Sequence, residues 1–93
     1  MRESALEEHL RVAVRRLGGV CWKLPSKFYR GIPDRMILVP PGRVYFVELK
    51  ASNGRPTAFQ LSRIAFLRKL GFDARILTGP DELKAFIDAL PDL

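Results

Sequence analysis

Two apolar runs on either side of a short proline and glycine segment place the strongest constraint on how this chain folds. The runs cover residues 36–39 and 44–47, and a Pro-Pro-Gly segment at 40–42 separates them. Runs of β-branched, aromatic and aliphatic residues bounded by proline and glycine are typical of two strands joined in a hairpin. If the glycine takes a left-handed conformation at the end of a three-residue loop, Val39 lies opposite Arg43. The sequence therefore predicts a β-hairpin with this register.

Three charged residues lie at the open end of the predicted hairpin. The same register places Asp34 opposite Glu48, with Cβ atoms about 4.5–5.5 Å apart. Side chains alternate between the two faces of a strand, so Lys50 shares a face with Glu48. A divalent cation such as Mg²⁺ is usually held by one or two carboxylates, waters and substrate phosphates, and it would relieve the repulsion between the two acids. Two alternatives stay open: these are ordinary charged ends of a surface hairpin, or a one-residue slip turns Asp34 to the other face.

The charged residues belong to a longer pattern that resembles a known family of nucleases. Pro33-Asp34 followed, after one hairpin, by Glu48-Leu49-Lys50 resembles the PD-(D/E)xK core of restriction-endonuclease-like folds. The stand-alone viral and bacterial type of the VRR-Nuc family is similar over more positions: Leu6-Glu7, Leu17-Gly18-Gly19, residues 31–35, Gly42-Arg43, residues 46–51 and Gln60. This likeness extends from about residue 3 to residue 77, which is most of the chain.

The resemblance implies a metal-dependent nuclease with Mg²⁺ or Mn²⁺ as its cofactor. The positions that would hold the metal are Asp34, Glu48 and the backbone carbonyl of Leu49, with Glu7 helping through a water molecule. Lys50 would orient or deprotonate the attacking water. Gln60 would lie near the metal and the substrate phosphate. The catalytic residues implied by the family are therefore Asp34, Glu48, Lys50, Gln60 and Glu7.

The N-terminal segment predicts a helix over residues 3–17, because apolar residues recur there at helical spacing and two glycines follow. Ser4 is expected to cap its start. Glu7 lies at the edge of the apolar face and is the acidic residue best placed to face inward. Glu3 projects toward the same face and is the second candidate. The helix dipole alone also favours acidic residues in a first turn.

A second helix is predicted over residues 57–70, and its first turn bears on the site. Thr57 and Gln60 have the spacing of a capping box, which by itself explains the glutamine. A helix N-terminus beside the site is also a natural cradle for a phosphate. The apolar face of this helix is broad, which favours burial against the sheet and against a second subunit.

The expected elements follow one another in the order αβββαβα. The first strand covers residues 20–24, the fourth strand residues 72–77 and the last helix residues 81–90. A helix between the third and fourth strands favours a parallel pair with a right-handed crossover. The fold class is therefore α/β, a restriction-endonuclease-like core with a mixed four-stranded sheet flanked by helices. With 93 residues the chain has room for one nuclease domain, residues 1–93.

The charge of the chain favours a polyanionic partner. It has 16 Lys and Arg residues against 10 Asp and Glu residues, a net charge of +6. Phe28 or Tyr29 would stack on an unpaired base. The alternatives are that the charge serves solubility and that the aromatic residues form a minor core. The basic residues expected to contact DNA phosphates are Lys23, Lys27, Arg30, Arg35 and Arg55.

The cellular setting and the partners follow from what the sequence lacks and from the resemblance. No run of 18 apolar residues and no signal peptide is found, so we expect a protein without a membrane span in the cytoplasm of a bacterium or a phage-infected cell. Cys21 is expected to be a buried small residue. The family implies a homodimer that cuts branched DNA such as four-way (Holliday) junctions. A non-catalytic DNA-binding module and a nuclease subunit of a larger phage or repair complex are the alternatives.

Overall fold

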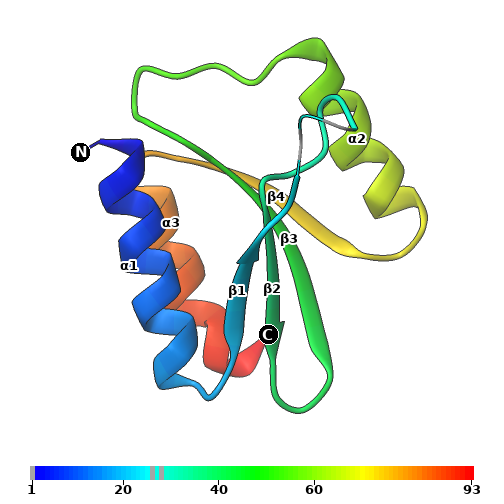
Figure 1. Cartoon of the computed structure of the whole chain (residues 1–93). Helices are drawn as coiled ribbons and strands as arrows, with labels where there is room; N and C mark the ends of the chain where they lie inside the picture. The colour runs from blue at the N-terminus through cyan, green and yellow to red at the C-terminus, as the bar shows by residue number, and fades with distance from the viewer. Residues whose placement is uncertain (1, 26, 28) are drawn as a thin grey trace.

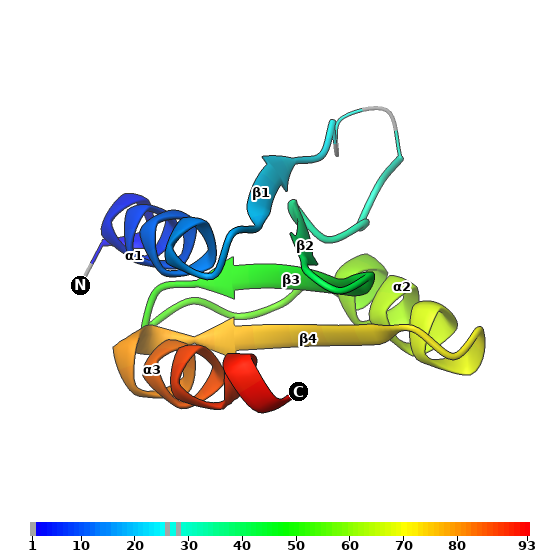
Figure 2. The same ribbon diagram turned by 90° about the horizontal axis from the view of Figure 1, so that it is seen from below.

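A four-stranded sheet carries helices on both of its faces (Figures 1 and 2). The computed structural model describes residues 2–25, 27 and 29–93. Its elements are α1 (Glu3–Arg16), β1 (Val20–Lys23), β2 (Arg35–Val39), β3 (Arg43–Lys50), α2 (Ala58–Lys69), β4 (Asp73–Thr78), α3 (Gly79–Ala89) and a short 3₁₀ helix (Leu90–Asp92). The predicted α/β class and the order αβββαβα are confirmed.

The sheet has the strand order β1-β2-β3-β4, and its hairpin has the predicted register. β1 with β2 and β2 with β3 are antiparallel, whereas β3 and β4 are parallel through the α2 crossover. Val39 lies opposite Arg43, and Gly42 takes a left-handed φ of 60°. At the other end Arg35 pairs with Val47. The next pair outward is therefore Asp34 with Glu48, so the hairpin brings the two acids together.

The main core lies between the sheet and the helices α1 and α3, which share one face (Figure 2). Helix α1 contributes Leu6, Leu10 and Val14, and the sheet contributes Ile37, Val47 and Leu49, all fully buried. From α3 and the 3₁₀ helix come Leu83, Phe86 and Leu90. Because Leu6 packs here, the first turn of α1 is held beside the open end of the hairpin.

Helix α2 covers the other face, and it buries less of its apolar surface than its sequence predicts. Ile64 is buried, but Leu61, Phe66 and Leu70 are each more than half exposed. The expected burial of this helix against the sheet is thus wrong for Leu61 and Leu70. The reason is geometric, because α2 contacts the sheet mainly at β4 and turns only the side that carries Ile64 toward it (Figure 2).

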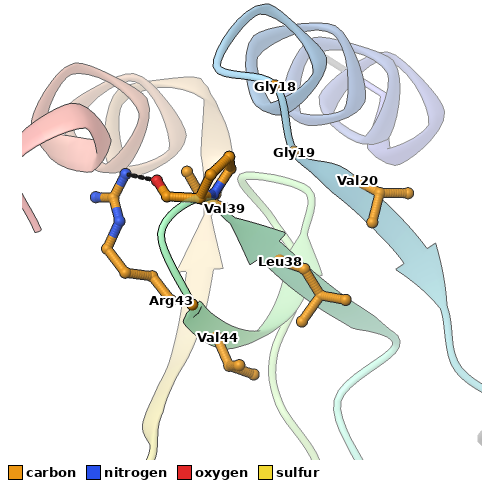
Figure 3. A pocket seen from close by; sticks show the side chains of 9 residues that line it. Gly18, Gly19, Val20, Leu38, Val39, Arg43 and Val44 are labelled. Atoms are coloured by element: carbon orange, nitrogen blue, oxygen red, sulfur yellow. Dashed lines mark hydrogen bonds between the residues drawn. The ribbon is translucent and has the colours of Figure 1, made fainter.

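The closed end of the hairpin is tied to the C-terminal segment by Arg43. Its guanidinium donates hydrogen bonds to the carbonyl oxygens of Leu90 at 2.7 Å, Leu93 at 2.8 Å and Pro40 at 2.9 Å. Figure 3 shows the bond to Pro40 beside a pocket of about 410 Å³ between the hairpin and the turn that follows α1. This apolar pocket lies at the end of the sheet opposite to the charged residues.

The structure also bears on smaller predictions about the helix caps and the single cysteine. Ser4 does not cap α1, because the helix begins at Glu3 and its N-cap is Arg2, without a side-chain cap. Cys21 is half-buried, and burial raises the pKa of its thiol. The capping box of Thr57 and Gln60 is present as predicted. Among the described residues, no helix has the length and apolar character that crossing a membrane requires.

Candidate active site

Six of the predicted site residues line one pocket of about 380 Å³ at the open end of the hairpin, and Lys50 is not among them. Helix α1 borders it on one side, and the first turn of α2 borders it on the other. The segment between β1 and β2 closes a third side. The residues that line the pocket are Glu3, Glu7, Lys23, Arg30, Gly31, Ile32, Asp34, Glu48 and Gln60.

Three carboxylates form a cluster in this pocket. One oxygen each of Glu3, Asp34 and Glu48 lies within 4.8 Å of the other two. The backbone N–H of Asp34 donates a hydrogen bond to Oε1 of Glu48 at 3.2 Å, which fixes the two acids relative to each other. Oδ1 of Asp34 is buried and has no hydrogen-bond partner among the described residues. A buried carboxylate oxygen without a partner, next to two further carboxylates, fits a hard divalent cation with oxygen ligands.

Burial and mutual repulsion disfavour the charged forms of Asp34 and Glu48, and a bound cation would relieve both effects. Glu48 is buried, and this burial, together with the negative charge of Asp34, raises its pKa to about 7. Burial also raises the pKa of Asp34, and the Glu7 carboxylate contributes, although the nearby Arg35 acts in the opposite direction. Two carboxyl groups whose ionised forms are disfavoured in the same pocket are typical of a functional site.

Lys50 lies at the edge of this cluster, on the same face of β3 as Glu48. Its Nζ atom is 3.5 Å from Oε2 of Glu48, and its side chain is largely buried. The predicted sharing of a face is therefore confirmed. The ammonium group counters part of the charge of the buried pair, since it lowers the pKa of Glu48 against the effect of burial.

Glu7 faces the pocket as predicted, and it forms an ion pair with Arg35 that the sequence did not predict. Its Oε2 atom is 2.9 Å from Nη2 of Arg35, and Nε of Arg35 lies 4.0 Å from Oδ2 of Asp34. The clustered acid from α1 is Glu3, the second candidate. Arg35 is buried, because it opens β2 with its side chain on the face that α1 covers. Only 10% of its side chain is exposed, which leaves little surface for the contact with a DNA phosphate that the sequence suggested.

Gln60 lines the pocket from the first turn of α2 and also stabilises that turn. Its Oε1 atom accepts the N–H of Thr57 at 2.9 Å, and its own N–H donates to Oγ1 of Thr57 at 3.1 Å. With the carboxamide oxygen engaged, the NH₂ group is the part that can donate to a ligand. The structural role of the capping box and a role in the pocket are therefore compatible.

Basic and aromatic residues surround the pocket. Lys23 and Arg30 line it, and Lys27 and Arg55 are exposed nearby in sequence. The guanidinium of Arg30 lies 4.2 Å from the centre of the ring of Phe59, a contact that the sequence did not reveal because it joins a loop to α2. The expected stacking of Phe28 lies outside the described residues. Tyr29 is 66% exposed and so does not form a minor core.

Known proteins resemble this chain in sequence and in fold. No protein-family model matches the chain. A curated relative, "Putative nuclease p44" of Acyrthosiphon pisum secondary endosymbiont phage 1, is 41% identical over 81 residues, which cover 87% of each protein. A solved structure named "VRR_NUC domain" has a TM-score of 0.83 at 27% identity and covers 92% of this chain and 94% of its own. Another, "VRR_NUC domain protein", shares the fold with a TM-score of 0.71 at 22% identity, covering 95% and 86%. With its matching fold and this level of identity to a phage relative, the chain belongs to the VRR_NUC family.

Proposed function

We propose that this protein is a nuclease that hydrolyses phosphodiester bonds in DNA with Mg²⁺ or Mn²⁺ bound at the acidic cluster. The observation that carries the proposal is the largely buried pair of Asp34 and Glu48, in which the backbone N–H of Asp34 donates to the Glu48 carboxylate and Lys50 lies 3.5 Å from Glu48. A non-catalytic DNA-binding module has no need for this combination. The name of the phage relative, a nuclease, supports the same conclusion.

The roles of the residues follow from their positions. Asp34, Glu48 and the Leu49 carbonyl would hold the ion, Glu3 would supply a third carboxylate, and Glu7 would act through water. When bound, such an ion polarises a phosphate and lowers the pKa of a coordinated water. The Lys50 side chain orients or deprotonates the attacking water, and in its charged form it offsets negative charge on the phosphate. The NH₂ group of Gln60 positions water or phosphate.

The basic residues around the pocket provide a path for the DNA backbone. Lys23 and Arg30 line the pocket itself, so they would contact the phosphates next to the scissile bond. Lys27 and Arg55 are exposed and would bind phosphates farther along the strand. Branched DNA with unpaired or bent segments at the branch point is our proposed substrate, and the four-way junction is its symmetric form.

A labelled panel of DNA structures tests this function. The panel holds a four-way junction, a flap, a splayed arm, a duplex and a single strand, each incubated with Mg²⁺, Mn²⁺ or EDTA. We expect cleavage of the branched molecules with either metal and none with EDTA. Cleavage that persists in EDTA contradicts the metal site. Tight binding to junctions without cleavage under any metal indicates a binding module, or a nuclease subunit that lacks its partner.

We further propose that the protein acts as a homodimer through the exposed apolar surface of α2. Phe59, Phe66 and Leu70 are exposed and lie on one side of this helix at 100° per residue. Phe66 also borders an apolar groove of about 240 Å³, which it shares with Leu24, Phe46 and other apolar residues. A chain this short gains stability when a second copy covers such a surface. Two sites related by a two-fold axis would suit paired cuts across a symmetric junction.

A charge placed in this surface will separate the subunits. We expect Phe66→Glu to convert a dimer into a monomer of 10.6 kDa, because burying an unpaired carboxylate in an apolar interface is costly. Sedimentation equilibrium measures the mass directly. Ala85→Glu, on the exposed side of α3, adds the same charge away from α2 and should leave the dimer intact. A wild-type protein that is monomeric throughout, or a Phe66→Glu variant that stays dimeric, would contradict this interface.

A further inference from the structure

The ion pair of Glu7 and Arg35 lies directly beside the acidic cluster but outside it. Arg35 is 2.9 Å from Glu7 and 4.0 Å from Asp34, measured between the nearest nitrogen and oxygen atoms. The side chain of Arg35 is 10% exposed, so its charge acts where water screens it poorly. A guanidinium does not lose its proton in a protein, which makes this a permanent positive charge next to a proposed metal ligand.

Arg35 pairs with one acid of α1, and the other acid belongs to the cluster. Glu3 and Glu7 are four residues apart, so they lie on the same face of the helix, and both line the pocket. Glu7 is engaged by Arg35, whereas Glu3 lies within 4.8 Å of Asp34 and Glu48. All four acids line the pocket, and without Arg35 the Glu7 carboxylate would be free to turn toward a bound ion as a fourth ligand.

The number of carboxylates matters because the substrate is itself an anion. Four carboxylates around one divalent cation leave the site negative, and a phosphodiester is then repelled from it. The two nearby cations, Arg35 and Lys50, cancel half of the charge of the four carboxylates, and the divalent ion cancels the other half. The occupied site is then close to neutral, and a phosphate oxygen can approach the ion.

We infer that Arg35 is a positioning residue for the metal site: it holds Glu7 away from the cation and limits the negative charge of the pocket so that a phosphate can enter. The consequence is a site that binds its cation more weakly than its acidic residues would allow. This inference rests on the proposed function, because it takes the acidic cluster to be a divalent cation site.

The test is the affinity for Mn²⁺ in the absence of DNA, measured from the electron paramagnetic resonance signal of the free ion. Replacing Arg35 by a neutral residue, in R35M, should tighten Mn²⁺ binding about tenfold, because a positive charge is removed beside Asp34 and Glu7 becomes free. R35Q serves as a second variant, since it keeps a donor for Glu7 and removes only the charge. E7Q should instead weaken binding about tenfold, because Arg35 then turns its charge toward Asp34.

Two further variants act as matched controls. R35K keeps the charge beside Asp34, and D81N removes an exposed carboxylate of α3 away from the site, so each should bind Mn²⁺ within about threefold of the wild type. A pair with a merely structural role would lower thermal stability when broken but would not tighten metal binding. Unchanged or weaker Mn²⁺ binding in both R35M and R35Q overturns the inference. If the wild type itself binds no Mn²⁺, the proposed metal site fails as well, so the two failures are distinguishable.

Discussion

Replacing Lys50 by alanine will lower the rate of DNA cleavage by about 10²–10⁴-fold, and the protein will still fold and bind metal. Losses of this size are typical when a group that moves a proton or stabilises charge in the transition state is removed. Lys50 ends β3, where its backbone pairs with Thr78 of β4. The alanine variant keeps this backbone pairing, which does not depend on the side chain.

A second variant separates the role of Lys50 from that of the metal ligands. Asp34→Asn removes the charge of a buried carboxylate whose Oδ1 atom lacks a partner, so it should lose both Mn²⁺ binding and cleavage. Lys50→Ala should lose cleavage and keep Mn²⁺ binding. The two variants therefore distinguish a group that holds the ion from one that acts on the water or the phosphate.

Single-turnover cleavage of a labelled junction gives the rate, and circular dichroism checks the fold. Lys84→Ala is the matched control, since it removes an exposed lysine from α3, far along the chain from the site residues. We expect this control to cleave at the wild-type rate. Wild-type cleavage by both the Lys50→Ala and Asp34→Asn proteins would show that the acidic cluster is not the active site.

The central part of this fold was predictable because its determinants are local in sequence. Two apolar runs and one Pro-Pro-Gly segment define the hairpin, and the loop length sets the register that pairs Val39 with Arg43. The register then brings Asp34 next to Glu48 without any knowledge of the helices. The capping box of Thr57 and Gln60 is equally local, since both residues belong to one turn.

The site residues that the sequence misplaced depend on contacts between distant elements. Glu3 and Glu7 lie on one helix face, so periodicity alone does not tell which of them reaches Asp34. The packing of α1 on the sheet decides this, and it also turns Arg35 toward Glu7 and away from solvent. Sequence composition identifies Arg35 as basic but does not reveal the carboxylate that will face it.

Surface exposure was the other property that the sequence did not specify. A broad apolar face on a helix predicts that something covers it, but not whether the cover belongs to the same chain. In the structure Ile64 faces the sheet, whereas Leu61 and Leu70 are exposed. The contact of Arg30 with Phe59 was missed for a related reason, because it depends on the path of the loop between β1 and β2.

Replacing Glu48 by glutamine will stabilise the metal-free protein above pH 7 and abolish its stabilisation by Mg²⁺ or Mn²⁺. Burial and the charge of Asp34 raise the pKa of Glu48 from 4.5 to about 7 in the folded protein. Between these two values the folded state keeps a proton that the unfolded state has released. The free energy of unfolding therefore falls as the pH rises from about 4.5 to about 7, and above pH 7 the full cost of an ionised buried carboxylate is present.

The size of this effect follows from the shift. Each pKa unit corresponds to about 1.4 kcal/mol, so a shift from 4.5 to about 7 lowers the stability of the metal-free protein by roughly 3 kcal/mol at pH 8. When a divalent cation is bound, the ionised Glu48 stabilises the folded protein instead, because the cation favours the ionised carboxylate and releases the proton. Affinity for the cation should thus fall up to about tenfold for each pH unit below 7.

Urea unfolding at pH 5 and pH 8, with EDTA or with Mn²⁺, measures these quantities. The wild type in EDTA should have a lower free energy of unfolding at pH 8 than at pH 5. In Glu48→Gln this difference between the two pH values should be much smaller, and Mn²⁺ should not raise the free energy of unfolding. Asp81→Asn, at an exposed carboxylate of α3, is the control and should respond to Mn²⁺ as the wild type does. A Glu48→Gln protein that is no more stable than the wild type at pH 8 in EDTA would show that the folded protein accommodates the charge of Glu48 without a cation. The buried acids of this site would then need no metal to balance them, and the strongest physical argument for a cation between Asp34 and Glu48 would be lost.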